Sequence, residues 1–312
     1  DASMSNGRRS AVIGVAVVLV VLAAILAFVL LNQKQAAPQA SPSASASASA
    51  SASLNQELLT KRLTVLVIGT DSSKVRRSQG INTINTDSMI VASISADQSK
   101  VTLISLPRDT VDIPLPDGTT WTSKVNGIEA ARAVDALVGA VSELFGVPID
   151  GYVQVDMDGL VALVDAVGGV KVNPAEALTD PKVSLSIPAG QQQLDGATAL
   201  KYARTRVDTD YGRAARQQEV VLDLVARLVS PQTDVDVAQL LHGLDSLETD
   251  LPLDDLPTLL EIARRAQDAT ITRQVLKPPQ FISFEGDRGD GRGYILEPNV
   301  DAIRAYLAEE IH

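Results

Sequence analysis

The longest uninterrupted apolar run of the chain covers residues 11–31 and contains no charged side chain. As a helix rising about 1.5 Å per residue, such a run spans roughly 30 Å, the thickness of a bilayer core. Arg8 and Arg9 precede the run, and only Lys34 follows it closely. Positive charge stays in the cytoplasm, so we expect residues 1–10 to form a cytoplasmic tail and the rest of the chain to lie outside. The alternative is a cleaved signal peptide, but its apolar region is shorter.

Residues 32–56 lack the large apolar side chains that a folded core needs. Most of the stretch from Pro42 to Ser53 alternates Ser with Ala. Such a composition does not offset the entropy cost of ordering, and it predicts a flexible spacer. A globular composition begins at residue 57, so we expect one extracytoplasmic domain over residues 57–312.

The hydrophobic pattern of this domain changes repeatedly between short branched runs and helical spacing. Short runs bounded by turn residues predict strands, and apolar positions three or four residues apart predict helices. The expected strands cover residues 63–69, 89–95, 101–106, 152–155, 271–276 and 281–284. The expected helices cover residues 126–145, 160–167, 195–203, 214–229, 236–248 and 254–268, with a last one beginning near Pro298. The pattern predicts an α/β fold, a mixed central sheet flanked by helices in an α/β/α sandwich.

Composition restricts the chemistry of this domain. There is no cysteine, and the histidines are His242 and the terminal His312. Zinc sites of the usual kind and Cys–His nucleophiles are therefore excluded, and a Ser–His–Asp triad has only two candidate bases. The net charge of −11 argues against nucleic acid as a partner. Carboxylates, arginines and hydroxyls are left, and these suit phosphate handled with a hard divalent cation.

Basic residues concentrate between Lys201 and Gln217, where five basic side chains accompany two acidic ones. Arg204 and Arg206 would point to one side of an extended segment, and Arg213 and Arg216 would neighbour each other on a helix face. Such a fork of guanidiniums suits a polyanion. The alternative is a solvated, salt-bridged surface, which is the commoner role of a charge cluster.

Three carboxylates stand at the ends of predicted strands. Asp71 follows the first strand, Asp87 is placed just before the second, and Asp109 comes just after the third. Ligands bind at strand ends in α/β folds, and Mg²⁺ accepts few carboxylates together with substrate phosphates. Each of the three is equally interpretable, taken alone, as a turn or cap residue.

Several motifs in fixed order resemble those of the LytR-CpsA-Psr family. The motifs cover 67–71 (VIGTD), 86–89 (TDSM), 105–110 (SLPRDT), 124–126 (KVN), 167–170 (VGGV), 194–206 (LDGATALKYARTR) and 210–217 (DYGRAARQ). The resemblance runs from about residue 63 to 230 and continues through residues 293–296. It implies a single-pass protein of the cell membrane with an extracytoplasmic catalytic domain.

The activity that this resemblance implies is a magnesium-assisted phosphotransfer, with Mn²⁺ as an alternative ion. The donor would be a polyprenyl-pyrophosphate-linked glycan such as teichoic acid, capsule or arabinogalactan. The acceptor would be a hydroxyl of peptidoglycan, and polyprenyl phosphate would be released. The lipid tail would enter an apolar groove between the sheet and helices.

The resemblance also assigns roles to single residues. Asp71 and Asp87 would hold the metal, and Asp210 would orient the arginines. The residues implied to grip the pyrophosphate are Arg108, Arg204, Arg206, Arg213 and Gln217. Arg108, Asp87 and Asp109 would act in the chemistry, with Asp87 or Asp109 as a base.

One departure from the family pattern affects the phosphate site. Asn85 stands where the family usually has an arginine, and Ser72, Ser73 and Lys74 follow Asp71 without the usual arginine. Arg76 or Arg77 is the candidate to reach in from the loop. This departure keeps two other functions open: a non-catalytic binder of polyprenyl phosphate or wall polymer, and a pyrophosphatase that releases the polymer to water.

Overall fold

The computed structural model describes residues 54–81, 84–230 and 232–311, so the predicted tail, anchor and most of the spacer lie outside the described residues. A six-stranded mixed sheet forms the centre, in the order β11-β6-β1-β2-β3-β12. β1 runs parallel to β6, and β3 runs parallel to β12; the other neighbours are antiparallel. The strands of this sheet are β1 (Leu63–Thr70), β2 (Thr86–Ile94), β3 (Lys100–Ser105), β6 (Gly151–Val155), β11 (Leu247–Thr249) and β12 (Thr270–Val275).

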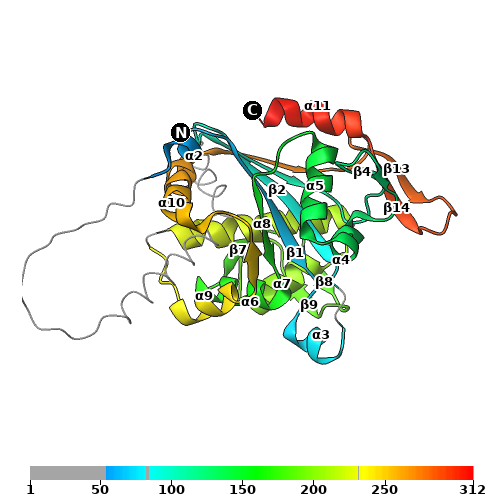
Figure 1. Ribbon diagram of the computed structural model, residues 1–312. Helices are drawn as coiled ribbons and strands as arrows, with labels where there is room; N and C mark the ends of the chain where they lie inside the picture. The colour runs from blue at the N-terminus through cyan, green and yellow to red at the C-terminus, as the bar shows by residue number, and fades with distance from the viewer. Residues whose placement is uncertain (1–53, 82–83, 231, 312) are drawn as a thin grey trace, which may run out of the picture.

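Helices cover both faces of the sheet (Figure 1). Val65 and Val67 of β1 pack into one hydrophobic core, and Leu66 and Ile68 pack into the other. Because adjacent side chains of a strand point to opposite faces, a strand covered on both faces is mostly apolar, as β1 is apart from Thr64 and Thr70. The mixed α/β sandwich predicted from the pattern is therefore confirmed.

The first face carries α6 (Met157–Ala166), α7 (Gly196–Arg204), α8 (Asp210–Val229), α9 (Val237–Leu244), α10 (Leu256–Arg265) and the short α2 (Gln56–Leu59), of which α6, α7 and α8 border the site. The opposite face carries α4 (Ile128–Arg132), α5 (Val134–Phe145) and α11 (Val300–Glu310), while α3 (Lys74–Ser78) projects from the edge of the sheet where β1 ends (Figure 1). Three single-turn 3₁₀ helices are η1 (Val125–Gly127), η2 (Leu253–Asp255) and η3 (Ala266–Asp268). Among the described residues, no helix combines the length and apolarity that crossing a membrane requires.

Short hairpins lie around the sandwich; of their strands, the hydrophobic pattern predicted only the one expected over residues 281–284, which the structure has as Ile282–Asp287. They pair β4 (Ile113–Pro114) with β5 (Thr120–Trp121), β7 (Val170–Val172) with β10 (Gln192–Leu194), β8 (Leu178–Asp180) with β9 (Leu185–Ile187), and β13 (Ile282–Asp287) with β14 (Tyr294–Pro298). With two to six residues, most of these strands are too short for a period to be read.

Several predicted helices have different bounds in the structure. The helix expected over residues 236–248 ends at Leu244, and Leu247–Thr249 form strand β11 instead, where they pair with β6. The helix expected over residues 126–145 is divided at Ala133, whose positive φ of 75° ends α4 before α5 begins. Conversely, α8 begins at Asp210 and not at Ala214, because the Thr209 side chain caps it by accepting a hydrogen bond from the Gly212 amide. Pro298 ends β14, and Asn299 caps the last helix instead.

Candidate functional site

The edge of the sheet at which β1 and β6 end gathers the predicted metal carboxylates. Asp71 follows β1 directly, as expected. Asp87 lies within β2 and not before it: Gly69 pairs with Ser88 and Thr70 pairs with Thr86, so Asp87 is the extra residue of a β-bulge. A bulge redirects a side chain at a strand end, a common device beside active sites. Both carboxylates line the same cavity.

Asp71 is buried and held in place by the residue that replaces the family arginine. Its Oδ1 accepts a hydrogen bond from the Asn85 amide at 2.9 Å, and its Oδ2 accepts one from Asn85 Nδ2 at 3.0 Å. Arg76 of α3 reaches the same Oδ2 with its Nη2 at 3.1 Å. Arg76 therefore contacts Asp71 directly, whereas Arg77 pairs at 3.2 Å with Asp156, another carboxylate that lines the cavity.

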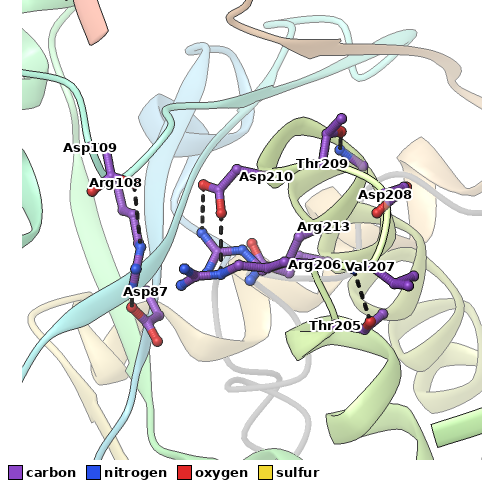
Figure 2. Close-up of polar contacts among 12 residues, drawn as sticks. Asp87, Arg108, Asp109, Thr205, Arg206, Val207, Asp208, Thr209, Asp210 and Arg213 are labelled. Atoms are coloured by element: carbon purple, nitrogen blue, oxygen red, sulfur yellow. Dashed lines mark hydrogen bonds and ion pairs between the residues drawn. The ribbon is translucent and has the colours of Figure 1, made fainter. Parts of the chain in front are cut away.

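Arg108 follows β3 and links the other two predicted carboxylates (Figure 2). Its Nη1 donates to Asp87 Oδ1 at 2.5 Å, and its Nε lies 3.8 Å from Asp109 Oδ2. Asp109 is also paired with Lys124 Nζ at 2.8 Å. Burial acts to lower the pKa of Arg108, but Asp87 and Asp109 outweigh it and keep the pKa above its usual value.

Two further arginines meet at the start of α8. Asp210 accepts from Arg213 Nη2 at 2.9 Å through one oxygen and contacts Arg206 Nε at 3.2 Å through the other. Figure 2 shows both guanidinium groups pointing toward the Arg108–Asp87 pair. Burial, with help from Arg206 and Arg108, lowers the pKa of Arg213 to about 10 despite the opposing charge of Asp210. A buried cation shifted in this way gains from an additional anion.

The basic cluster predicted between residues 201 and 217 divides into two parts, because Arg216 does not join Arg213. Arg216 is buried, donates to Asp208 through both Nη atoms at 2.8 and 2.9 Å, and donates to the carbonyls of Thr205 at 2.6 Å and Tyr202 at 3.2 Å. Gly212 permits this arrangement, since a Cβ there would lie 2.1 Å from Asp208 Oδ2. Arg216 thus fixes the loop that carries Arg206 and does not join the group formed by Arg108, Arg206 and Arg213.

Arg204 is placed differently from the prediction. It is the last residue of α7 and not part of an extended segment with Arg206, and its exposed side chain lines the mouth of the cavity. Gln217 lines the same cavity and donates through Nε2 to the Ala203 carbonyl at 3.2 Å. The structure therefore brings Asp71, Asp87, Arg204 and Gln217 to one cavity, with the Arg108 and Arg213 groups beside it.

The interior of this cavity is apolar. It contains about 630 Å³ of empty space, including its open mouth, between the sheet and helices α6, α7 and α8. Apolar side chains from these four elements line it: Val67, Ile68, Val155, Met157, Leu160, Leu200, Ala203, Val220 and Val221. The expected apolar groove between sheet and helices thus exists, and it opens beside the charged groups.

The carboxylates present fit a hard cation that takes its remaining ligands from a substrate. Among the described residues, no three His, Cys, Asp or Glu side chains gather as a closed metal site. Asp71 and Asp87 face one cavity, however, and a carboxylate offers about four acceptor positions, of which each uses only some here. Mg²⁺ is typically bound by one or two carboxylates plus phosphates and waters, so the pair fits that ion.

The arginines retain unused donors that suit an anion. In the described part of the chain, Arg108 Nε and Arg213 Nε are buried without a hydrogen-bond partner. Buried donors normally have partners, so two orphaned donors on neighbouring guanidiniums point to a ligand that supplies acceptors. Phosphate oxygens match the forked donors of arginine.

Sequence reasoning missed three side chains that shape the site. Asp156 follows β6, caps α6 and lines the cavity, and the rule that selected Asp71 would have found it, because both follow a strand at the same edge. Lys124 neutralises Asp109 from a motif to which no role had been given. Glu129 accepts from Thr86 Oγ1 at 2.7 Å beside the bulge, and no local pattern marks it.

Comparison with known proteins agrees with the family resemblance of the sequence motifs. A family model described as the LytR_cpsA_psr family matches residues 26–295. The chain is 30% identical over 259 residues to the cell wall biosynthesis protein LcpA of Corynebacterium glutamicum, covering 73% of this chain and 49% of that protein. It is 35% identical over 199 residues to the polyisoprenyl-teichoic acid–peptidoglycan teichoic acid transferase TagU of Enterococcus faecalis, covering 62% of this chain and 63% of that protein. The chain thus spans about half to two thirds of the length of these curated relatives.

Solved structures share the fold. An Enterococcus faecalis protein described as a transcriptional regulator superposes with a TM-score of 0.64 at 26% identity, over 83% of this chain and 90% of that one. Bacillus subtilis TagV gives a TM-score of 0.64 at 24% identity, over 81% and 98% of the two chains.

Proposed function

The chain belongs to the LytR_cpsA_psr family, and from that premise we propose that it transfers a glycopolymer from a polyprenyl-pyrophosphate carrier to peptidoglycan and releases polyprenyl phosphate. The name of the Enterococcus faecalis relative, a polyisoprenyl-teichoic acid–peptidoglycan teichoic acid transferase, supports this class of donor and acceptor. Which glycopolymer is carried is left open by this proposal.

One observation carries the proposal: an apolar cavity lies beside a cluster of guanidiniums, with Asp87 lining the cavity and paired with Arg108. The side chains change from apolar to charged along one face of α8. Val221 and Val220 line the cavity, Gln217 lies at its mouth, and Arg213 reaches the anion site. These positions are three or four residues apart and so share a helix face. Val220 and Arg213 are separated by roughly 10 Å along the axis at about 1.5 Å per residue. A ligand with an apolar tail and a polyanionic head matches both ends.

The metal is part of the proposal. We propose that Asp71 and Asp87 hold Mg²⁺, for which Mn²⁺ is the alternative, once the substrate phosphates complete its ligands. The ion would supply positive charge that offsets the charge on the pyrophosphate and on the departing phosphate. Arg108, Arg206 and Arg213 act in the same sense from fixed positions, because Asp87 and Asp210 orient their guanidinium groups.

The reaction is a displacement at the phosphorus next to the glycan. The acceptor hydroxyl oxygen forms a bond to this phosphorus, and the bond to the bridging oxygen breaks. The bridging oxygen leaves with polyprenyl phosphate, so the glycan becomes linked to the acceptor through a phosphodiester. The hydroxyl proton passes to a carboxylate. Asp109 is our candidate base, because Asp87 would be committed to the metal.

The proposed location is the cell membrane, with residues 11–31 as the anchor, the N-terminus inside and the catalytic domain outside. An anchor keeps the site close to a donor that is itself confined to the membrane, which raises the effective concentration of the donor.

The test is product analysis with the full chain in detergent. The chain is incubated with a synthetic polyprenyl-pyrophosphate glycan and peptidoglycan oligomers, with and without Mg²⁺, and products are identified by mass spectrometry. We expect a metal-dependent phosphodiester adduct that Asp87→Ala abolishes. Asp117→Ala, which changes an exposed turn outside the site, is the matched control.

The other outcomes identify the competing functions. Donor that stays bound and intact under every metal condition would indicate a binding protein. Donor that is cleaved without an adduct in the presence of acceptor would indicate a pyrophosphatase.

A further inference from the structure

Tyr294 presents its ring to solvent beside the charged site. With 49% of its surface exposed, it is the aromatic residue among the exposed large hydrophobic side chains of the described residues. It begins β14, and two residues later the Leu296 amide donates to the Asp109 carbonyl at 3.1 Å. The ring therefore stands on a strand that is hydrogen-bonded to the segment carrying Arg108 and Asp109.

The hydroxyl of this ring is held by a carboxylate that also holds a second tyrosine. Tyr294 Oη donates to Glu285 Oε1, and Tyr211 Oη donates to Glu285 Oε2 at 3.1 Å. Tyr211 directly follows Asp210 in the first turn of α8. Glu285 of β13 thus joins the hairpin to the helix that positions the anion site. We call Tyr211, Glu285 and Tyr294 the tyrosine cluster.

The cluster is rigid because the hairpin is fixed on both sides of Tyr294. On one side, the Val111 amide donates to the Leu296 carbonyl at 2.9 Å. On the other, Arg292 Nη1 donates to both oxygens of Asp112 at 3.1 Å. A preorganised ring loses little conformational entropy when a ligand covers it.

The charges around Tyr294 keep its hydroxyl protonated and uncharged. Burial, Glu285, Asp109 and Asp210 together raise the pKa of Tyr294 to about 12, so its hydroxyl stays protonated at physiological pH.

We propose that the tyrosine cluster is a subsite for a pyranose ring of the glycan, stacked on Tyr294 with its hydroxyls toward Glu285. A pyranose has an apolar C–H face and a hydroxyl rim, and a tyrosine offers an apolar face with a polar end. This inference rests on the proposed function.

The order of groups along α8 indicates which glycan the ring belongs to. From the cavity outward come Val220 and Val221, then Arg213, then Tyr211. A glycolipid donor has the same order of tail, pyrophosphate and first sugar. The geometry therefore favours the first sugar of the donor, and an acceptor sugar is the other source of the same chemistry.

Binding of two lipids to the full chain in detergent tests the subsite without requiring turnover. One lipid is a polyprenyl diphosphate without sugar, and the other is the same lipid with one N-acetylhexosamine on its diphosphate. We expect Tyr294→Ala to weaken binding of the sugar-bearing lipid by about tenfold and to leave the bare lipid unchanged. Tyr294→Phe keeps the ring and should bind both lipids within about threefold of the wild type.

Phe284→Ala is the matched control. Phe284 lies on the same hairpin, but its ring lies under the Arg288 guanidinium at 3.8 Å, so both dissociation constants should stay unchanged. Thermal unfolding of each variant verifies that the hairpin change leaves the fold intact.

The remaining results distinguish a donor sugar from an acceptor sugar, and a failure of the subsite from a failure of the proposed function. Unchanged lipid binding together with a raised KM for peptidoglycan oligomers in Tyr294→Ala would assign the ring to the acceptor. Unchanged lipid binding and unchanged acceptor KM would overturn the subsite while the proposed function stands. A wild-type chain that binds neither lipid would overturn both.

Discussion

Arg213 offers the sharpest test of the proposed anion site. Its side chain is buried, with 3% of its surface exposed, and one of its Nη atoms is committed to Asp210. Its Nε is buried without a partner among the described residues. The substitution Arg213→Met keeps a long apolar stem and removes the guanidinium, so it removes the donors that we expect to face the phosphates.

The size of the effect follows from what the transition state of the reaction and the folded state of the protein each lose. Removing one preorganised donor group from developing charge typically lowers the rate about 100- to 1000-fold, roughly 3–4 kcal/mol. The folded state loses less, because Asp210 keeps Arg206 at 3.2 Å and an unfavourably buried cation is replaced by an apolar group. We therefore expect kcat/KM to fall about 100- to 1000-fold while the free energy of unfolding changes by less than about 1 kcal/mol.

The assay measures transfer from the sugar-bearing lipid to peptidoglycan oligomers near pH 8, well below the pKa of Arg213. Arg213→Lys keeps one charge without the fork and should lose about tenfold. Arg227→Met is the control, since Arg227 lies on the same helix and pairs with Asp223 at 2.9 Å. Transfer by Arg213→Met within about threefold of the wild type would refute the reasoning.

Three further predictions concern the surroundings of the site. Arg216→Lys should reduce the free energy of unfolding by about 2–3 kcal/mol in urea titrations, because two buried carbonyls lose their donor. An unchanged unfolding midpoint would contradict the role of Arg216 in fixing the loop. Burial acts to raise the pKa of Asp208, but hydrogen bonds from Arg216 keep it below its usual 3.8. Its stabilisation is thus present above about pH 4 and lost as the pH falls through the folded pKa, so the stability difference between the wild type and Asp208→Asn should be smaller at pH 3 than at pH 7. Val221→Phe should fill part of the cavity and weaken polyprenyl diphosphate binding about tenfold without changing inorganic pyrophosphate binding, and equal weakening of both would disprove a lipid role for the cavity.

Much of the fold follows from local pattern. The run from Leu63 to Gly69 is apolar at every position except Thr64, which is typical of a strand covered on both faces. The helix over 195–203 was predicted from an Asp cap, and Asp195 does accept from the Thr198 amide at 2.8 Å. Ala133 marks the limit of this reasoning: nothing in the sequence around it reveals that this residue takes a positive φ and divides a helix.

For the candidate site, too, the sequence predicted some features and not others. The order of motifs and the excess of arginine identified the residue types, because phosphate chemistry requires charged side chains that stand out from an acidic sequence. The hydrogen-bond and ion-pair partners of these residues could not be predicted from the sequence, since they depend on contacts between distant segments. Arg213 and Arg216 are one turn apart, yet one faces Asp210 and the other clamps Asp208.

What the sequence by itself determined is therefore the class of fold, the approximate positions of most long elements and the chemical character of the site, all of which depend on side chains near one another in the chain. Only the tertiary structure decided that Asp87 is the extra residue of a bulge, that Arg76 contacts Asp71 and that Glu285 joins Tyr211 to Tyr294. Residues 211 and 285 are 74 positions apart, and their contact depends on where the β13–β14 hairpin packs. Packing of this kind is set by the shape of the whole core, which no local period encodes.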